Sequence, residues 1–153
     1  MKIYLAARYL RRLELCYYRT QIQQLGLTVN GRWLDGAHEI IAPDETTDPS
    51  QRSNIILTLI LQDIAREKKD ALLEAKFADE DFQDVAASDL LIAFTETPNS
   101  GFSRGGRHVK LGIAMGMGKK VWVVGHRENV FCWHEGVIFF QQWEDAFAAL
   151  KSG

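Results

Sequence analysis

The chain has 153 residues, of which 46% are hydrophobic, and its 18 Lys/Arg and 20 Asp/Glu leave a formal net charge of -2. A chain of this size forms one domain with its own core. The weak net charge gives no electrostatic basis for binding nucleic acid or an anionic membrane, so we expect a small-molecule ligand or a second copy of the chain as partner.

The first 30 residues predict a strand, a helix and a second strand. Residues 2–6 are a short apolar run typical of a buried strand. Residues 9–25 predict a helix, and Gly26 is typical of a helix C-terminus. A second strand begins at residues 27–29. The predicted apolar stripe of the helix consists of Leu10, Leu13, Cys16, Tyr17, Ile22 and Leu25.

The middle of the chain predicts a long connection followed by helices and the clearest strand. Residues 35–53 are polar and contain two prolines, and connections this long are functional or flexible. A helical pattern runs over residues 54–77, and Asp79 is placed to cap a short second helix through residue 87. Residues 90–94 are continuously apolar and predict a buried strand.

The last third predicts two more strands and two more helices. Gly105 and Gly106 precede a helix over residues 109–117, which ends at a further glycine. Residues 120–124 predict a buried strand followed by Gly125. A short strand over residues 135–140 and a helix over residues 143–150 complete the chain.

Strands that alternate with helices predict a parallel sheet with right-handed crossovers. The strands are continuously apolar, which is typical of a sheet covered on both faces. We therefore expect residues 1–153 to form a single α/β domain. Its predicted architecture is a flavodoxin-like or Rossmann-like three-layer sandwich with a mainly parallel sheet of about five strands.

Ligands of such sheets bind beyond the carboxyl ends of the strands, where the loops converge. No GxGxxG follows the first strand and no GxxxxGK[ST] occurs, so neither a dinucleotide nor a P-loop site is predicted. The His and Cys spacing predicts no metal site, and we expect no cofactor. The candidate substrate-binding residues are Ala7, Arg8, Tyr9, Arg32, Trp33, Gly105, Gly106, Arg107, His108 and Asn129.

Several of these residues also have a purely structural interpretation. The glycine pair is equally explained by a tight turn into a helix. Trp33 either stacks on a planar ring of a ligand or covers the edge of the sheet. Arg8, Arg104 and Arg107 either bind a phosphate or meet solvent.

Taken in order, five segments resemble the nucleoside 2-deoxyribosyltransferase family over nearly the full length of the chain. Their order and spacing are more specific than any one segment. The segments are residues 4–8 (YLAAR), 32–36 (RWLDG), 84–96, 104–114 (RGGRHVKLGIA) and 125–131 (GHRENVF).

The resemblance implies a retaining double displacement, in which a glutamate attacks the anomeric carbon of a deoxynucleoside and expels the base. Lys110 stands where the family has that glutamate. An ammonium about 4 Å from the developing positive charge costs roughly 4 kcal/mol at an effective dielectric near 20.

Three alternatives follow. In the first, the chain binds nucleosides or nucleotides without catalysing transfer. In the second, Lys110 is a variant position in an otherwise active enzyme. In the third, another carboxylate has taken over the role of the nucleophile. Glu96, at the end of the third strand, is the candidate for that carboxylate. An unrelated flavodoxin-like regulatory domain is a weaker interpretation, because the acidic cluster expected after the first strand is absent.

The resemblance further implies a role for Asp84 in handling the leaving base; otherwise Asp84 is a solvated helix carboxylate. It implies that Asn129 contacts the sugar in a neighbouring subunit's site, and hence a homo-oligomer of two or more subunits. The expected ligands are a nucleoside or nucleoside monophosphate and a free nucleobase. We expect a cytoplasmic location, because no signal peptide or spanning segment is visible.

Overall fold

A computed structural model describes residues 1–36, 71–97 and 105–153 of the chain. Its centre is a five-stranded sheet in the order β2-β1-β3-β4-β5, in which every pair of neighbours is parallel. This confirms the predicted α/β architecture. The strands are β1 (Lys2–Ala6), β2 (Thr28–Asn30), β3 (Leu90–Phe94), β4 (Lys120–Val124) and β5 (Val137–Phe140).

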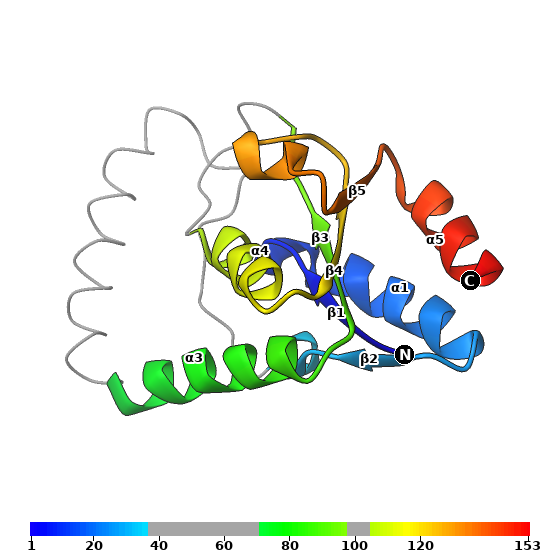
Figure 1. Cartoon of the computed structure of the whole chain (residues 1–153). Helices are drawn as coiled ribbons and strands as arrows, with labels where there is room; N and C mark the ends of the chain where they lie inside the picture. The colour runs from blue at the N-terminus through cyan, green and yellow to red at the C-terminus, as the bar shows by residue number, and fades with distance from the viewer. Residues whose placement is uncertain (37–70, 98–104) are drawn as a thin grey trace, which may run out of the picture.

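Helices cover both faces of the sheet. α1 (Arg12–Gln24) and α5 (Trp143–Ser152) lie on one face, and α3 (Ala71–Ala86) and α4 (Gly106–Gly116) lie on the other (Figure 1). Three short 3-10 turns follow β1, β2 and β4: η1 (Tyr9–Arg11), η2 (Arg32–Asp35) and η3 (Val130–Trp133). The predicted connection over residues 35–53 and the helical pattern over 54–77 fall largely outside the described residues.

The core is built on the central strands. Residues 3–6 of β1 and all of β3 are buried, because helices cover both sides of these strands. In the register of the sheet, Tyr4 is paired with Leu91, and Phe94 with Val124. Continuous apolar sequence, rather than alternation, follows from this two-sided burial.

The predicted apolar stripe over residues 9–25 is wrong for three of its six residues. Leu10, Leu13 and Tyr17 are exposed by 52%, 75% and 62%. Ile22 of the predicted stripe is buried, and Leu15, outside that stripe, is buried with it. Tyr18 stacks on Trp143 and Phe94 with ring centroids 4.5 and 5.4 Å apart. The sequence of this helix carries two apolar stripes. The stripe with Leu15, Tyr18 and Ile22 faces the core, because Tyr18 stacks with aromatic rings from β3 and α5.

Two helix starts also differ from those predicted. α3 is continuous through Asp79, which is exposed within it, so Asp79 does not begin a second helix. α4 begins at Gly106, three residues before the predicted start. Gly105 precedes it with φ of +78°, a left-handed conformation that favours glycine.

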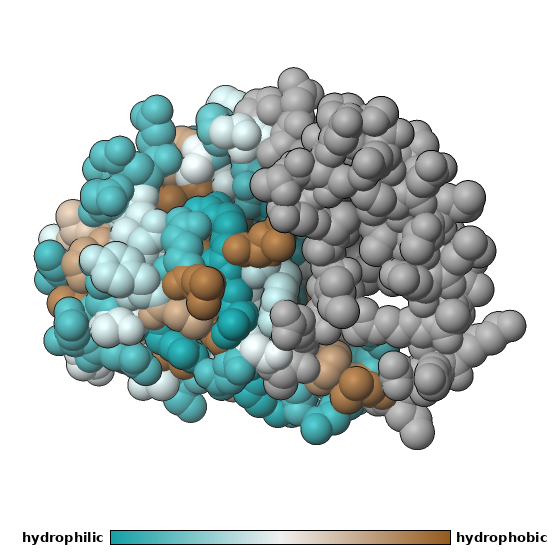
Figure 2. All heavy atoms as spheres, turned by 180° about the vertical axis from the view of Figure 1, so that it is seen from behind, coloured by the Kyte–Doolittle hydropathy of each residue, from teal (hydrophilic) through white to brown (hydrophobic). Residues whose placement is uncertain are grey.

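On the side shown in Figure 2, hydrophobic residues are scattered among hydrophilic ones over the described part of the surface. They do not form one large apolar patch there. No helix in residues 1–36, 71–97 or 105–153 has the length and apolar character needed to cross a bilayer.

We predict that Glu14→Gln makes the protein less sensitive to acid. Arg11 donates two hydrogen bonds of 2.7 Å to Glu14, and this pairing, with a further bond from Tyr18, lowers the pKa of Glu14. The lowered pKa contributes stability above the unfolded-state pKa of about 4.3, and that contribution is lost as the pH falls through the folded-state pKa. The stability difference between wild type and Glu14→Gln should therefore shrink between about pH 6 and pH 3 in urea unfolding. The control is Glu135→Gln, at an exposed position. The prediction is contradicted if the stability difference between wild type and Glu14→Gln depends on pH no more than the difference for Glu135→Gln.

Candidate active site

The carboxyl ends of β3 and β4 are joined to the start of α4 by a buried arginine and partly buried charged side chains around it. Arg107, in the first turn of α4, has a side chain only 3% exposed. Its Nη2 donates to both carboxylate oxygens of Glu128, at 2.6 and 2.8 Å. Glu128 also accepts the backbone N–H of Glu96 at 2.8 Å. The loop after β4 is therefore fastened to both β3 and α4.

Glu96 lies between two guanidinium groups. Its Oε1 is 3.6 Å from the Nη1 atoms of both Arg11 and Arg107, too far for a hydrogen bond. This oxygen and the Nε and Nη1 atoms of Arg107 are buried without a hydrogen-bond partner. We call Arg11, Glu96, Arg107 and Glu128 the arginine–glutamate cluster. The carboxylate of Glu96 is therefore held by charge within that cluster.

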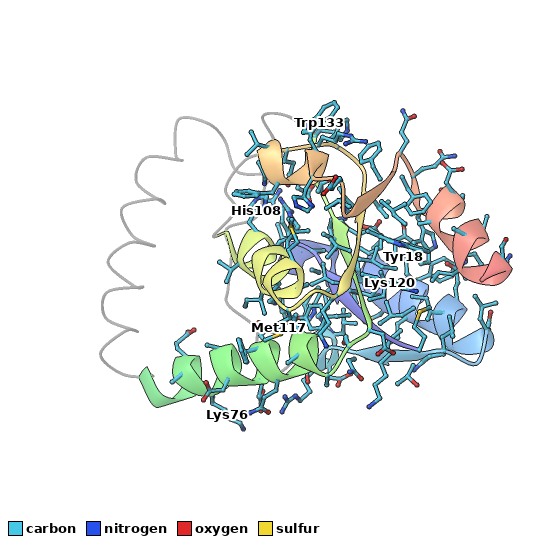
Figure 3. All side chains as sticks on the ribbon, viewed as in Figure 1. Tyr18, Lys76, His108, Met117, Lys120 and Trp133 are labelled. Atoms are coloured by element: carbon cyan, nitrogen blue, oxygen red, sulfur yellow. The ribbon has the colours of Figure 1, made fainter. Side chains whose placement is uncertain are left out.

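His108 lies on the side of α4 that faces η3 (Figure 3), and Asn129 is the N-cap residue of η3. Nδ2 of Asn129 is 3.2 Å from Nδ1 of His108, and its Oδ1 accepts the N–H of Phe131 at 2.9 Å. Asn129 therefore caps η3 within its own chain. A pocket of about 350 Å³ opens beside this pair, lined by His108, Leu111, Gly112, Met115, Asn129 and Phe131.

Gly125, directly after β4, allows the chain to pass close to Thr95. Its φ is +116°, and a Cβ built there would lie 2.7 Å from Thr95 Oγ1 and 3.1 Å from the Thr95 carbonyl oxygen. The Thr95 hydroxyl donates to the carbonyl oxygen of Val124 and accepts the N–H of His126. A side chain at residue 125 would therefore displace the loop that carries Glu128.

We predict that Gly125→Ala lowers the free energy of unfolding by about 2 kcal/mol, from backbone strain and overpacking together. Urea unfolding measures this loss. The matched control is Gly116→Ala, because a Cβ there meets nothing within 4 Å and lies in a helix, where alanine is the better residue. Equal stability of the two variants would contradict the prediction.

Lys110, one turn further along α4, forms the second polar group of the site. Its Nζ lies 2.8 Å from Asp81 Oδ2 on α3, and the Tyr4 hydroxyl donates to Asp81 Oδ1, also at 2.8 Å. The side chains of Lys110 and Asp81 are 16% and 21% exposed, so the pair is partly accessible. We call Tyr4, Asp81 and Lys110 the Tyr–Asp–Lys triad.

Aromatic rings form one wall of the triad. The ammonium of Lys110 is 5.6 Å from the ring centroid of Tyr4 and 5.5 Å from that of Trp33. Burial, reinforced by the Asp81 carboxylate, raises the pKa of Tyr4 well above its ordinary value. Tyr4 is therefore a neutral donor at physiological pH. A cation placed here meets both a carboxylate and aromatic faces.

The predicted candidates from η2 lie beside the triad and have structural contacts. Asp84 accepts the backbone N–H of Arg32 at 2.8 Å and is 3.0 Å from its Nη2, which ties α3 to η2. Trp33 is 3% exposed and donates from Nε1 to the Leu5 carbonyl oxygen at 3.0 Å. Both residues thus help to fix the wall of the site.

The remaining candidates lie at the ends of β1 and α4. Ala7, Arg8 and Tyr9 follow β1 directly, and the ring of Tyr9 is 6.3 Å from that of Trp33. Gly105 and Gly106 form the start of α4. Arg104 lies outside the described residues. No group of three or more potential metal ligands occurs in the part of the chain that the structure describes.

The sequence interpretation missed Asp81. Tyr4 reads as a core residue of a strand, and Asp81 reads as a solvated helix residue, so neither signals the triad alone. The available signal was the spacing of Asp81 and Asp84, which puts both on one face of a helix. Arg11 is not among the candidates from the sequence either, although it reaches the carboxyl end of β3 and donates to the Thr95 carbonyl oxygen.

No family model matches the sequence, and no curated protein matches it. Solved structures do. A 2-deoxyribosyltransferase from Bacillus psychrosaccharolyticus is similar with a TM-score of 0.55 at 17% identity, covering 98% of this chain and 96% of that one. A CMP N-glycosidase from Clostridium botulinum is similar with a TM-score of 0.51 at 16% identity, covering 98% of each chain.

A 2-deoxyribosyltransferase from Leishmania mexicana is also similar, with a TM-score of 0.56 at 14% identity over 99% of this chain and 97% of that one. Likeness over the whole length agrees with the order of the five sequence segments. This chain therefore has the fold of the nucleoside 2-deoxyribosyltransferases.

Proposed function

We propose that this protein acts on the N-glycosidic bond of a nucleoside or nucleoside monophosphate, by a retaining double displacement. The observation that carries the proposal is the Tyr–Asp–Lys triad, a partly accessible carboxylate held by two donors beside aromatic faces. The similar structures, a 2-deoxyribosyltransferase and a CMP N-glycosidase, support this reaction class.

The chemistry requires an anion close to the anomeric carbon. As the bond to the base breaks, positive charge develops on the sugar, and a carboxylate stabilises this charge before bonding to it. An isolated ammonium at residue 110 would oppose that charge. Pairing of Lys110 with Asp81 makes the local charge neutral, which removes most of the opposition.

The two carboxylates predicted from the sequence are held by arginines. Glu96 lies between Arg11 and Arg107, and Asp84 is bonded to Arg32. A carboxylate paired with a guanidinium is held in position by it, which suits electrostatic support of the sugar better than bonding to the anomeric carbon. Glu96 and Asp84 are therefore proposed as supporting groups.

We propose that the active form contains at least two copies of the chain. The apolar pocket beside η3 and the exposed side chains of Val130 and Phe131 lie next to Asn129, which the resemblance assigns to a neighbouring subunit's site.

The alternative is a nucleotide-binding protein without catalytic activity. The ion pair between Lys110 and Asp81 favours this alternative, because it occupies the carboxylate that the reaction would use. Binding would then serve sensing, sequestration or assembly.

Chromatography of reaction mixtures separates the two functions. The purified protein is incubated with each deoxynucleoside or its 5'-monophosphate, with and without a second free base. Release or exchange of the base supports the enzyme. Saturable binding of a nucleotide with no release under any condition supports the inactive protein, and absence of both contradicts the proposal.

A further inference from the structure

We propose that His108 and Asn129 form a pH-sensitive latch, which holds η3 against α4 while the ring of His108 is neutral and releases η3 when the ring is protonated. The latch joins the two walls of the apolar pocket of about 350 Å³. On one side the wall is α4, from His108 to Met115, and on the other side it is Asn129 and Phe131 of the η3 turn. The inference goes beyond the proposed function and does not depend on it.

The amide of Asn129 is oriented by its contacts with η3. Its Oδ1 accepts the backbone N–H of Phe131 at 2.9 Å and a weaker hydrogen bond from the Sγ of Cys132 at 3.7 Å. Nδ2 is therefore the atom that lies 3.2 Å from Nδ1 of His108. Because an amide nitrogen donates and does not accept, Nδ1 of His108 is the acceptor in this contact.

This contact decides which ring nitrogen of His108 carries the proton. A neutral imidazole has one accepting nitrogen, and two donors lie near the ring. Nδ2 of Asn129 is 3.2 Å from Nδ1, whereas Nη2 of Arg107 is 3.5 Å from Nε2 and already donates to both carboxylate oxygens of Glu128. The shorter contact, from a donor with fewer acceptors, takes the lone pair. Nδ1 therefore accepts, and Nε2 carries the proton.

Protonation of His108 removes this hydrogen bond. Nδ1 then presents an N–H to Nδ2 of Asn129, which is itself a donor. If the amide turned to offer Oδ1 to the ring, the N–H of Phe131 would lose its acceptor and η3 would lose its side-chain cap. In this arrangement, the protonated ring and the capped turn exclude each other.

Charges of both signs face the ring of His108. Oε2 of Glu128, in the loop after β4, is 3.6 Å from Nε2, and Nη2 of Arg107, on the same helix, is 3.5 Å from it. These two groups are bonded to each other at 2.6 Å, and Glu96, after β3, lies behind Arg107 at 3.6 Å from its Nη1. η3 itself (VFCW) contributes no charged side chain. The hydrogen bond with Asn129 is therefore the contact that protonation changes most.

Release of the latch frees a turn that presents apolar side chains. Val130, Phe131 and Trp133 are exposed by 77%, 62% and 68%, and Phe131 also lines the pocket. Histidine is the side chain that ordinarily changes charge between about pH 5 and pH 8. The latch is therefore held at the upper end of this range and lost as the pH falls through it, so the pocket opens on acidification.

Nuclear magnetic resonance of the full chain labelled with nitrogen-15 tests the latch. Long-range proton–nitrogen correlations distinguish Nδ1 from Nε2, and the signals of His108 are those that disappear in His108→Gln. At about pH 7.5 the ring proton is expected on Nε2. Between about pH 7.5 and pH 5 the amide proton of Phe131 is expected to shift upfield with the same midpoint as the ring of His108, because it loses its acceptor.

Two variants separate the latch from a general effect of pH. Asn129→Asp supplies a carboxylate that accepts both from a protonated Nδ1 and from the N–H of Phe131. The midpoint of His108 should then move to higher pH, and the Phe131 amide should no longer shift upfield on acidification. His134→Gln is the matched control, because His134 is the C-cap residue of η3. Its removal should leave the Phe131 shift unchanged.

Three results would each overturn the inference. They are a proton on Nδ1 at about pH 7.5, a ring of His108 that takes up no proton in the folded protein above about pH 5, and a Phe131 shift that persists in His108→Gln or is lost in His134→Gln. Circular dichroism shows whether each variant folds. If His108→Gln does not fold, the ring signals are assigned from the native protein, and an unchanged Phe131 shift in Asn129→Asp overturns the inference instead. Release or exchange of a base is measured separately and is unaffected by these outcomes.

Discussion

Replacing Arg107 by methionine is expected to lower the free energy of unfolding by about 3 kcal/mol. The side chain of Arg107 is 3% exposed, whereas those of Glu96 and Glu128 are 18% and 17% exposed. Methionine fills much of the volume but leaves Glu128 without its guanidinium and Glu96 with Arg11 alone. Most of the loss comes from this loss of charge compensation at two mostly buried carboxylates. Urea unfolding should show a lower midpoint with an unchanged slope.

A surface ion pair supplies the control. Lys76 is 65% exposed and pairs with Glu80 at 3.8 Å, so Lys76→Met should change stability by no more than about 0.5 kcal/mol. Adding Glu128→Gln to Arg107→Met should recover part of the loss, since it removes one unpaired carboxylate. If Arg107→Met is no more costly than Lys76→Met, the arginine–glutamate cluster does not stabilise the fold.

Under the proposed function, Asp81→Asn removes the charge of the carboxylate in the Tyr–Asp–Lys triad, and adding Lys110→Glu is expected to restore turnover by about 10²-fold or more over Asp81→Asn alone. The two side chains are 2.8 Å apart, so the exchange moves the negative charge from α3 to α4 within one hydrogen bond. The amide at residue 81 can then donate to the new carboxylate. Initial rates of base release measure the recovery.

Lys110→Glu alone is the informative contrast. It places a second carboxylate beside Asp81, and two like charges at this distance raise the pKa of one of them. The pH profile of this variant should therefore shift, whereas that of the double variant should not. A double variant as inactive as Asp81→Asn, although folded and able to bind nucleoside, would show that the reacting centre lies away from this pair.

Much of the fold could be predicted from local sequence. The bounds of β1, β3 and β4 match the apolar runs over residues 2–6, 90–94 and 120–124, because strands buried on both faces are apolar without interruption. The buried side of α1 could not be predicted in this way. It depends on stacking of Tyr18 with Phe94 and Trp143, which lie far away in the sequence.

The position of the site could be predicted from the sequence, but the contacts within it could not. The rule that ligands bind beyond strand ends led to the start of α4 and to the loops after β1, β3 and β4. The partners within the site could not be read in this way. The Tyr–Asp–Lys triad brings together β1, α3 and α4, and the arginine–glutamate cluster joins η1 to the ends of β3 and β4. Such pairings become visible only when packing places these elements side by side.

The most direct test of the central claim is the stereochemistry of base exchange. The native protein is mixed with a β-deoxynucleoside and a different free base, and proton NMR follows the anomeric proton of the product. A retaining double displacement predicts a new nucleoside that keeps the β configuration. Product of the α configuration, or an unchanged substrate in the presence of folded protein, would contradict it.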